Sequence, residues 1–341
     1  MDMLDTIEAL SLLCGASGSE RAVREWIIAR LPADKTEYTV DVMGNLLVTY
    51  HGNRRTGQKI MLEAHMDEVG VIVTYIEENG LLRFTPLGGI SPAVLCGKRM
   101  VFTNGTVGVI GIKPIHLSSE SERTHFAKAE DLYIDIGAAS KAEAGKRVAP
   151  GDTAVFQSEF IRFGHGKIKG KALDDRAGCA MLLQLMQRDD LPNLTFVFTV
   201  QEEVGLRGAE AAAFTVAPDW ALVVETTTAA DLPEVAGEKQ VCQLGSGPAV
   251  SFMDRATVYD PALYRMAMEL AQKHQIPAQT KTIVAGGNDS GAVHKSRGGV
   301  KTLAVSLPCR YLHSPACVLD TTDIDAGLAL LEKLIGALAD A

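Results

Sequence analysis

Apolar residues near the start of the chain recur at helical spacing. Every third residue from Leu4 to Leu13 is leucine or isoleucine, and a second apolar stripe runs from Val23 to Ile27. Residues three or four apart lie on one face of a helix, so both segments are predicted to be amphipathic helices. The break between them, at 15–20, is rich in glycine and serine and offers an N-cap to the second helix.

Uninterrupted apolar runs predict strands that are covered on both faces. The clearest, from Leu194 to Val200, contains β-branched and aromatic residues throughout. Because such runs alternate with helical periodicity, we expect an α/β/α sandwich over a largely parallel sheet. The other predicted strands are 38–42, 45–50, 59–64, 220–224 and 301–306, and the predicted helices are 177–186, 261–273 and 324–338.

The pattern changes between residues 71 and 166. Short alternating runs are separated there by glycine-rich turns, with little helical periodicity before Ser140. This texture predicts an inserted, β-rich, barrel-like domain. The catalytic domain is therefore expected to comprise 1–70 and 167–341, which meet around the insert.

Composition excludes several functional classes. The chain has 341 residues, 47% of them apolar, and a net charge of -9, which argues against a sequence-independent hold on nucleic acid or anionic membranes. No apolar run reaches the roughly 18 residues of a membrane span. The N-terminus lacks the pattern of a signal peptide, and the six cysteines are scattered, so we expect a cytoplasmic protein with reduced thiols. The spacing of Cys309, His313 and Cys317 does not match a usual thiolate metal site.

Acidic and imidazole side chains recur where the predicted strands end. In an open α/β sheet, ligands bind outside the carboxyl ends of the strands. Taken alone, an acidic pair there indicates a solvated turn, and Asp174 with Asp175 also suits the start of a helix. The candidate residues are His65, Asp67, Asp174, Asp175, Glu202, Glu203, Glu225 and His313.

Together, these side chains suit a pair of divalent ions. Imidazoles mixed with carboxylates are typical ligands of zinc, cobalt or manganese. If one aspartate bridges two ions, a water molecule between them can lose its proton and become a nucleophile near neutral pH. One of the adjacent acids Glu202 and Glu203 is then free to act as a general base, provided that the chain leaves strand geometry near Gly205.

Four motifs resemble the glutamyl aminopeptidase and tetrahedral aminopeptidase family of dinuclear metallopeptidases, some of whose members are labelled endoglucanase. The resemblance covers essentially the whole chain and includes the segments 15–20, 41–45 and 131–137. The four motifs are HMDEVG at 65–70, GKALDDR at 170–176, QEEVGLRGA at 201–209 and RYLHS at 310–314.

The resemblance implies a role for each candidate residue. His65 and His313 would each bind one of two divalent ions, most often zinc, with cobalt or manganese as alternatives. Asp174 would bridge the ions, with Asp175 as its supporting neighbour. The other implied roles are Glu203 and Glu225 as terminal ligands, Glu202 as general base and Asp67 as the residue that orients His65.

Two positions depart from the family pattern. Glu225 stands where the family most often has aspartate, which leaves Asp231 as an alternative ligand. In the glycine-rich segment 286–290, Asn288 replaces the usual threonine, and we expect this loop on the substrate side. The resemblance also implies homo-oligomers, often of twelve subunits, with the β-rich insert at the interfaces.

The leading hypothesis is a metal-dependent aminopeptidase that removes N-terminal residues from short peptides. A glycoside hydrolase is an alternative, because that chemistry needs only two carboxylates. A carboxypeptidase or deacylase is another, since Glu225 departs from the usual residue. A non-catalytic assembly protein would retain the fold without a working site.

Overall fold

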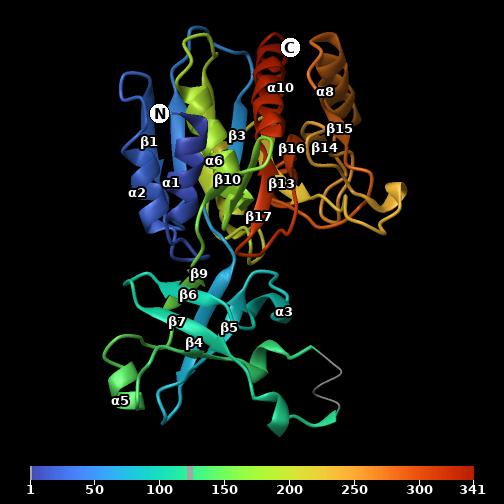
Figure 1. The fold of residues 1–341 in the computed structure, drawn as a ribbon. Coiled ribbons are helices and arrows are strands. Elements are labelled where there is room, and N and C mark those ends of the chain that lie inside the picture. Colours follow the sequence, from blue (N-terminus) through green and yellow to red (C-terminus); the bar gives the residue numbers. More distant parts are fainter. Residues whose placement is uncertain (1, 121–125) are drawn as a thin grey trace.

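The computed structural model describes residues 2–120 and 126–341, which form an α/β part and a smaller β-barrel (Figure 1). The chain crosses from the α/β part into the barrel and returns, so both termini lie in the α/β part (Figure 1). The fold therefore confirms the predicted α/β class with a barrel-like insert.

One sheet of eight strands forms the centre of the α/β part. Four adjacent strands, β12, β3, β13 and β16, run parallel, as the alternation of strands and helices predicts. The hairpin β1–β2 and the short strand β14 add antiparallel pairs on the two sides. In spatial order the strands are β1 (Thr36–Val40), β2 (Leu46–Tyr50), β12 (Leu194–Thr199), β3 (Ile60–His65), β13 (Trp220–Thr228), β16 (Lys301–Cys309), β14 (Ala249–Val250) and β15 (Gln279–Thr280).

Helices cover both faces of this sheet because its central strands are apolar on both sides. In β3, Ile60 and Leu62 belong to the larger core, whereas Met61 between them packs into a smaller core on the opposite face. The larger core is formed with α1 (Met3–Leu12), α2 (Arg21–Ile28), α6 (Leu173–Met186), α8 (Pro261–Lys273) and α10 (Thr321–Ala339), and the smaller core with α7 (Arg207–Val216) and α9 (Ser290–Val293).

The barrel closes in the order β4-β5-β8-β7-β6-β9 and has its own core of buried residues. Its last strand ends at Phe156, and the next strand along the chain, Ile161–Phe163, pairs with Lys167–Gly170 outside the barrel. The strands are β4 (Gly70–Ile76), β5 (Leu82–Leu87), β6 (Arg99–Phe102), β7 (Val107–Gly111), β8 (Tyr133–Asp135) and β9 (Thr153–Phe156).

Several short elements complete the description. A small antiparallel sheet lies where the chain returns from the barrel to the α/β part. Its strands are β10 (Ile161–Phe163), β11 (Lys167–Gly170) and β17 (Cys317–Asp320). The short helices are α3 (Pro92–Leu95), α5 (Lys141–Ala144), η1 (Ile115–Leu117), η2 (Ala129–Asp131) and η3 (Gly237–Lys239). The six cysteines are all free thiols. Among the described residues, the structure contains no helix with both the length and the apolar character needed to cross a membrane.

Candidate metal centre

The predicted site residues meet at the carboxyl edge of the parallel strands. His65 is the last residue of β3 and lies level with Thr199, the last residue of β12. Glu225 lies near the end of the neighbouring β13. Parallel strands end at one edge of a sheet, so these segments deliver their side chains to a common cleft.

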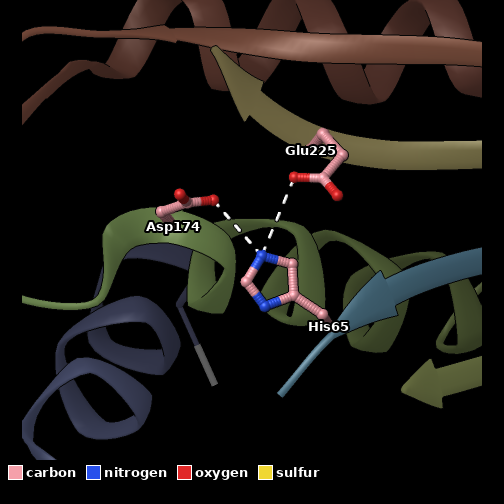
Figure 2. A group of neighbouring side chains, drawn as sticks. All are labelled: His65, Asp174 and Glu225. Atoms are coloured by element: carbon pink, nitrogen blue, oxygen red, sulfur yellow. Dashed lines mark hydrogen bonds and ion pairs between the residues drawn. The ribbon is translucent and has the colours of Figure 1, made fainter. Parts of the chain in front are cut away.

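The first cluster contains His65, Asp174 and Glu225 (Figure 2). The Nε2 atom of His65 lies 3.3 Å from Oδ1 of Asp174 and 3.8 Å from Oε2 of Glu225. All three residues are buried, and among the described residues the second oxygen of Glu225 has no hydrogen-bond partner. One nitrogen and two oxygens thus converge on one point.

A second cluster shares Asp174 with the first. Nε2 of His313 lies 3.4 Å from Oδ2 of Asp174 and 3.3 Å from Oε2 of Glu203. Each carboxylate oxygen of Asp174 therefore faces a different histidine. The ring of His313 is also fixed from the barrel side, because its Nδ1 lies 3.0 Å from the carbonyl oxygen of Gly89.

Asp67 is fully buried and connects His65 to the acidic turn. Its backbone oxygen lies 3.1 Å, and its carboxylate 3.4 Å, from Nδ1 of His65. The same carboxylate accepts hydrogen bonds from the backbone N–H groups of Glu202 and Glu203, at 3.0 and 3.2 Å. It also accepts one from the hydroxyl of Ser17 at 2.6 Å. One side chain therefore positions both an imidazole and the two adjacent acids.

The chain leaves strand geometry between β12 and α7, as two adjacent acids at one site require. Gln201 has a left-handed φ of 57°, and Gly205 has a φ of 117°. Glu202 and Glu203 consequently both line the same cavity. Glu203 belongs to the second cluster, whereas Glu202 belongs to neither.

The pKa values of several carboxyl groups in the site are raised, because burial disfavours their charged forms. Burial raises the pKa of Glu203 to about 8, and the nearby charge of Asp174 adds to this effect. Burial likewise raises the pKa values of Glu202 and Glu225 well above the ordinary carboxyl range. Although burial acts to lower it, the pKa of His313 rises to about 10 through its bond to Asp174 and the charge of Glu203. Bound cations would provide the positive charge that these groups otherwise obtain from protons.

Asp175, the neighbour of the proposed bridging residue, and Asp231, the alternative ligand, lie outside both clusters. Asp175 follows a cis peptide bond after Asp174, is fully buried and accepts a hydrogen bond from the N–H of Gly178. Asp231 instead accepts two hydrogen bonds from Arg310, at 2.8 and 2.7 Å, and one from the N–H of Leu244. The geometry therefore favours Glu225 over Asp231, and the longer glutamate side chain does reach the cluster.

A cavity of about 580 Å³ opens onto these side chains. Gly286, Gly287 and Asn288 of the glycine-rich loop line it. Sequence reasoning missed two contributions: Gly89 and Ser91 from the barrel, and Lys281 from the α/β part. None of these residues belongs to a recognisable motif, so no signal in the sequence marked them.

Comparisons with known proteins agree with this geometry. Residues 44–330 match the family model described as M42 glutamyl aminopeptidase. A putative aminopeptidase of Acetivibrio thermocellus is 40% identical over 98% of this chain and 98% of its own length. The lysyl aminopeptidase of Pyrococcus furiosus is 31% identical over 95% of this chain and 94% of its own. The glutamyl aminopeptidase of Lactococcus lactis is also 31% identical, over 99% and 97% of the two chains.

Solved structures of aminopeptidases are also similar to this chain. An aminopeptidase from the archaeon Desulfurococcus kamchatkensis superimposes with a TM-score of 0.92 at 33% identity, covering 98% of this chain and 94% of the other. The TET1 peptidase of Pyrococcus horikoshii, which can assemble into a tetrahedron or a large octahedral shell, has a TM-score of 0.86 at 35% identity, with 98% and 99% covered. The similarity therefore extends over both the α/β part and the barrel.

Proposed function

The chain belongs to the M42 glutamyl aminopeptidase family and is a peptide hydrolase, and from this premise we propose that it is a dinuclear metal-dependent aminopeptidase that acts on short peptides. The observation that carries the proposal is the position of Asp174. Its two carboxylate oxygens face two histidines, the buried His65 and the partly exposed His313, each of which also faces a separate glutamate. A glycoside hydrolase has no need of imidazoles against its carboxylates.

The residues fit two divalent ions. His65 and Glu225 would hold one ion, His313 and Glu203 the other, and Asp174 both. Mixed nitrogen and oxygen ligands suit zinc, with cobalt or manganese as alternatives. The unpartnered oxygen of buried Glu225 supports this reading, since a buried carboxylate is normally paired or bound to metal. When bound, such ions polarise a carbonyl group and lower the pKa of water.

Glu202 is the acid that can move the proton. It lines the cavity without belonging to either cluster, and its backbone N–H is held by Asp67. In our proposal, its carboxylate accepts a proton from the attacking water and donates it to the amino group of the departing peptide. Asp67 acts indirectly, because it orients His65 and the turn that carries Glu202.

The proposal is tested by the variant Glu202→Gln, assayed with aminoacyl p-nitroanilides in the presence of zinc, cobalt or manganese. Loss of a general base should lower kcat by about 10²- to 10⁴-fold. Metal content, measured by inductively coupled plasma mass spectrometry, should remain at the wild-type level, because Glu202 is not a proposed ligand. Glu210→Gln is the matched control, since Glu210 is exposed on α7.

Wild-type rates in Glu202→Gln would show that the base is another group. Acetylated peptides extend the test, because an aminopeptidase should reject a blocked amino group whereas a deacylase should accept it. Activity that survives exhaustive chelation would instead favour metal-independent chemistry, such as that of a glycoside hydrolase.

We further propose that the protein forms homo-oligomers through the barrel, which we take to be an inserted oligomerisation domain. Large apolar side chains are exposed there, including Ile115 at 74% and Leu117 at 61%. Such apolar exposure is typical of interaction surfaces. A cytoplasmic location is also proposed from the six free cysteines, and recovery in a membrane or extracellular fraction would contradict it.

A further inference from the structure

A second cavity, of about 1000 Å³, adjoins the cavity that contains the proposed metal ligands. Gly205 and Leu206 line both cavities, so the two meet at the end of the turn that carries Glu202 and Glu203. The rest of its wall comes mainly from α7 and from residues 291–297, at and after the end of α9. The proposed chemistry at the metal centre leaves this second cavity without a role.

Most charged residues of the second cavity are basic. Arg207, Lys295 and Arg297 line it, and the only acid among the described lining residues is Glu210. The chain as a whole has the opposite balance, with 42 acidic and 33 basic residues. The side chains of Arg207 and Lys295 are exposed and form no ion pair or hydrogen bond within the described chain. Three cations that line one cavity with a single acid favour an anionic ligand.

Arg297 is already held in position within this cavity. Its Nε donates to the carbonyl oxygen of Phe214 at 2.6 Å, and its guanidinium lies 4.2 Å from the centre of the Phe214 ring. Neither terminal nitrogen of the guanidinium has a hydrogen-bond partner among the described residues. A guanidinium fixed in this way loses little conformational freedom on binding, and its N–H groups suit the two oxygens of a carboxylate.

The proposed mechanism places the departing part of the substrate beside the second cavity. In that mechanism Glu202 donates a proton to the amino group of the departing peptide, so this end of the peptide lies at Glu202. The backbone N–H groups of Gly205 and Leu206 both donate to the carbonyl oxygen of Glu202 at 2.9 Å. The border between the two cavities is therefore one turn of the chain from the proton donor. An extended peptide advances about 3.3 Å per residue, so a few residues suffice to cross this border.

We propose that Arg207, Lys295 and Arg297 bind the C-terminal carboxylate of the substrate, so that the enzyme selects short peptides by their length and by a free C-terminus. The inference rests on the proposed function, which places the N-terminal residue of the substrate at the metal centre. The carboxylate of a dipeptide stays within one residue of the scissile bond, whereas that of a longer peptide can extend past Gly205 and Leu206. In a much longer chain, the carboxylate lies beyond the cations and contributes nothing.

The test compares peptides that differ only in the charge of the C-terminus. Leucine followed by one to five glycines, each as the free acid and as the amide, varies length and charge together. At the best length, the wild-type kcat/KM for the acid should exceed that for the amide about five- to tenfold, because several exposed cations act on one carboxylate. This ratio should be smaller for the dipeptide and should decrease as salt is added, since exposed charges are screened.

The double variant Arg207→Gln and Lys295→Gln should bring the ratio of acid to amide close to one. Arg297 is kept, because its loss would also disturb Phe214. The ratio is the readout, since a general loss of turnover affects acid and amide alike, and the melting temperature shows whether the variant folds. The control is Arg265→Gln with Lys273→Gln, which removes the same two charges from exposed positions of α8, on the opposite face of the sheet from α7. Its ratio should equal that of the wild type.

Three results would overturn the inference. One is a ratio near one at every length in the wild type. Another is a ratio that survives in the double variant, because the carboxylate would then bind elsewhere, as at the metal centre. The third is inhibition by inorganic phosphate of acid and amide hydrolysis alike, lost in the double variant, with a wild-type ratio near one. That result would show that the second cavity binds free anions instead.

Binding of a product separates this inference from the proposed function. If no peptide or aminoacyl substrate is hydrolysed with zinc, cobalt or manganese, the proposed function fails. Calorimetric titration of the metal-loaded protein with triglycine and with triglycinamide, which represent the departing peptide, still tests the second cavity. Tighter binding of triglycine by the wild type, lost in the double variant, supports the inference. Equal affinities of the wild type for the two compounds overturn it.

Discussion

At the scale of single residues, the candidate metal centre consists of ionisable side chains that are wholly or partly buried even without bound ions. Glu203 and Glu225 lie against His313 and His65, and Asp174 lies against both histidines. Each carboxyl pKa is shifted by burial and by its neighbours, so protonation and metal binding compete for the same oxygens.

This competition predicts how the metal-free protein responds to pH. Burial raises the pKa of Glu203 to about 8, so its protonated form favours folding below the unfolded value near 4.5, and this contribution is lost as the pH rises to about 8. The pKa of His313 is also raised, to about 10, by Asp174 and Glu203 against the effect of burial. Its contribution to stability is therefore likewise lost as the pH rises from about 6.5 to 10. Stability should therefore fall by a few kcal/mol between pH 5 and 9.

The measurement is the melting temperature of chelated and metal-loaded protein across that pH range. The stabilisation by added zinc should grow with pH, because the ions replace protons that are lost. A melting temperature of the chelated protein that is constant or rises with pH would contradict the assigned charges.

Most of these residues could be predicted from the sequence because their chemistry repeats at strand ends. Glu202 and Glu203 follow a run of seven apolar or β-branched residues after a single intervening residue, Gln201, and His65 ends a shorter, mostly apolar run. Lys281 has no comparable signal. It follows β15, a strand of only two residues, which is too short for any hydrophobic period to be detected.

At the scale of elements, long buried strands and amphipathic helices could be predicted from the sequence. The pairing of strands that are distant in the sequence could not. The apolar runs at 194–200 and 220–224 correspond to β12 and β13. Their spatial order, with β3 between them, follows from packing against helices on both faces rather than from any local pattern. The strand Ile161–Phe163 had no signal in the sequence, because it is short and exposed.

The junction between β12 and α7 gives a prediction for a glycine. A Cβ atom at Gly208 would lie 2.2 Å from the carbonyl oxygen of Val200, which accepts the N–H of Gly208. Gly208→Ala should therefore destabilise the protein by about 1–3 kcal/mol or more, and it should lower activity by displacing the turn that carries Glu202. Urea denaturation and the p-nitroanilide assay measure the two effects.

Gly336→Ala is the control for this variant. Gly336 also lies in a helix, α10, but a Cβ atom there meets nothing within 4 Å. Alanine favours a helix over glycine by about 1 kcal/mol, so this change should be neutral or stabilising. Equal effects of the two substitutions would show that the close approach of α7 to β12 is not a constraint.

At the scale of the whole molecule, the barrel contributes directly to the site. The carbonyl of Gly89 contacts His313, and Ser91 lines the cavity. The α/β part alone would therefore lack part of the cavity wall and the group that orients one of the predicted metal ligands.

The exposed apolar residues of the barrel predict assembly. Native mass spectrometry should give a multiple of the 36.4 kDa chain mass. The double variant Ile115→Glu and Leu117→Glu should lower that mass, because charges would replace apolar side chains at the proposed interface. Val42→Glu, at an exposed position on the hairpin of the α/β part, is the control. A wild-type protein that is monomeric at micromolar concentration would contradict this proposal.

The position of the barrel within the chain also sets the order in which the protein can be completed during synthesis. Both neighbours of β3 in the sheet, β12 and β13, are encoded after the barrel. A ribosome adding about 5–20 residues per second needs roughly 6–26 seconds to pass from His65 to Leu194. Throughout that interval β3 lacks its two neighbouring strands, whereas all the barrel strands, which pair only among themselves, are synthesised within it. The nascent chain thus acquires its closed domain first and its open sheet last.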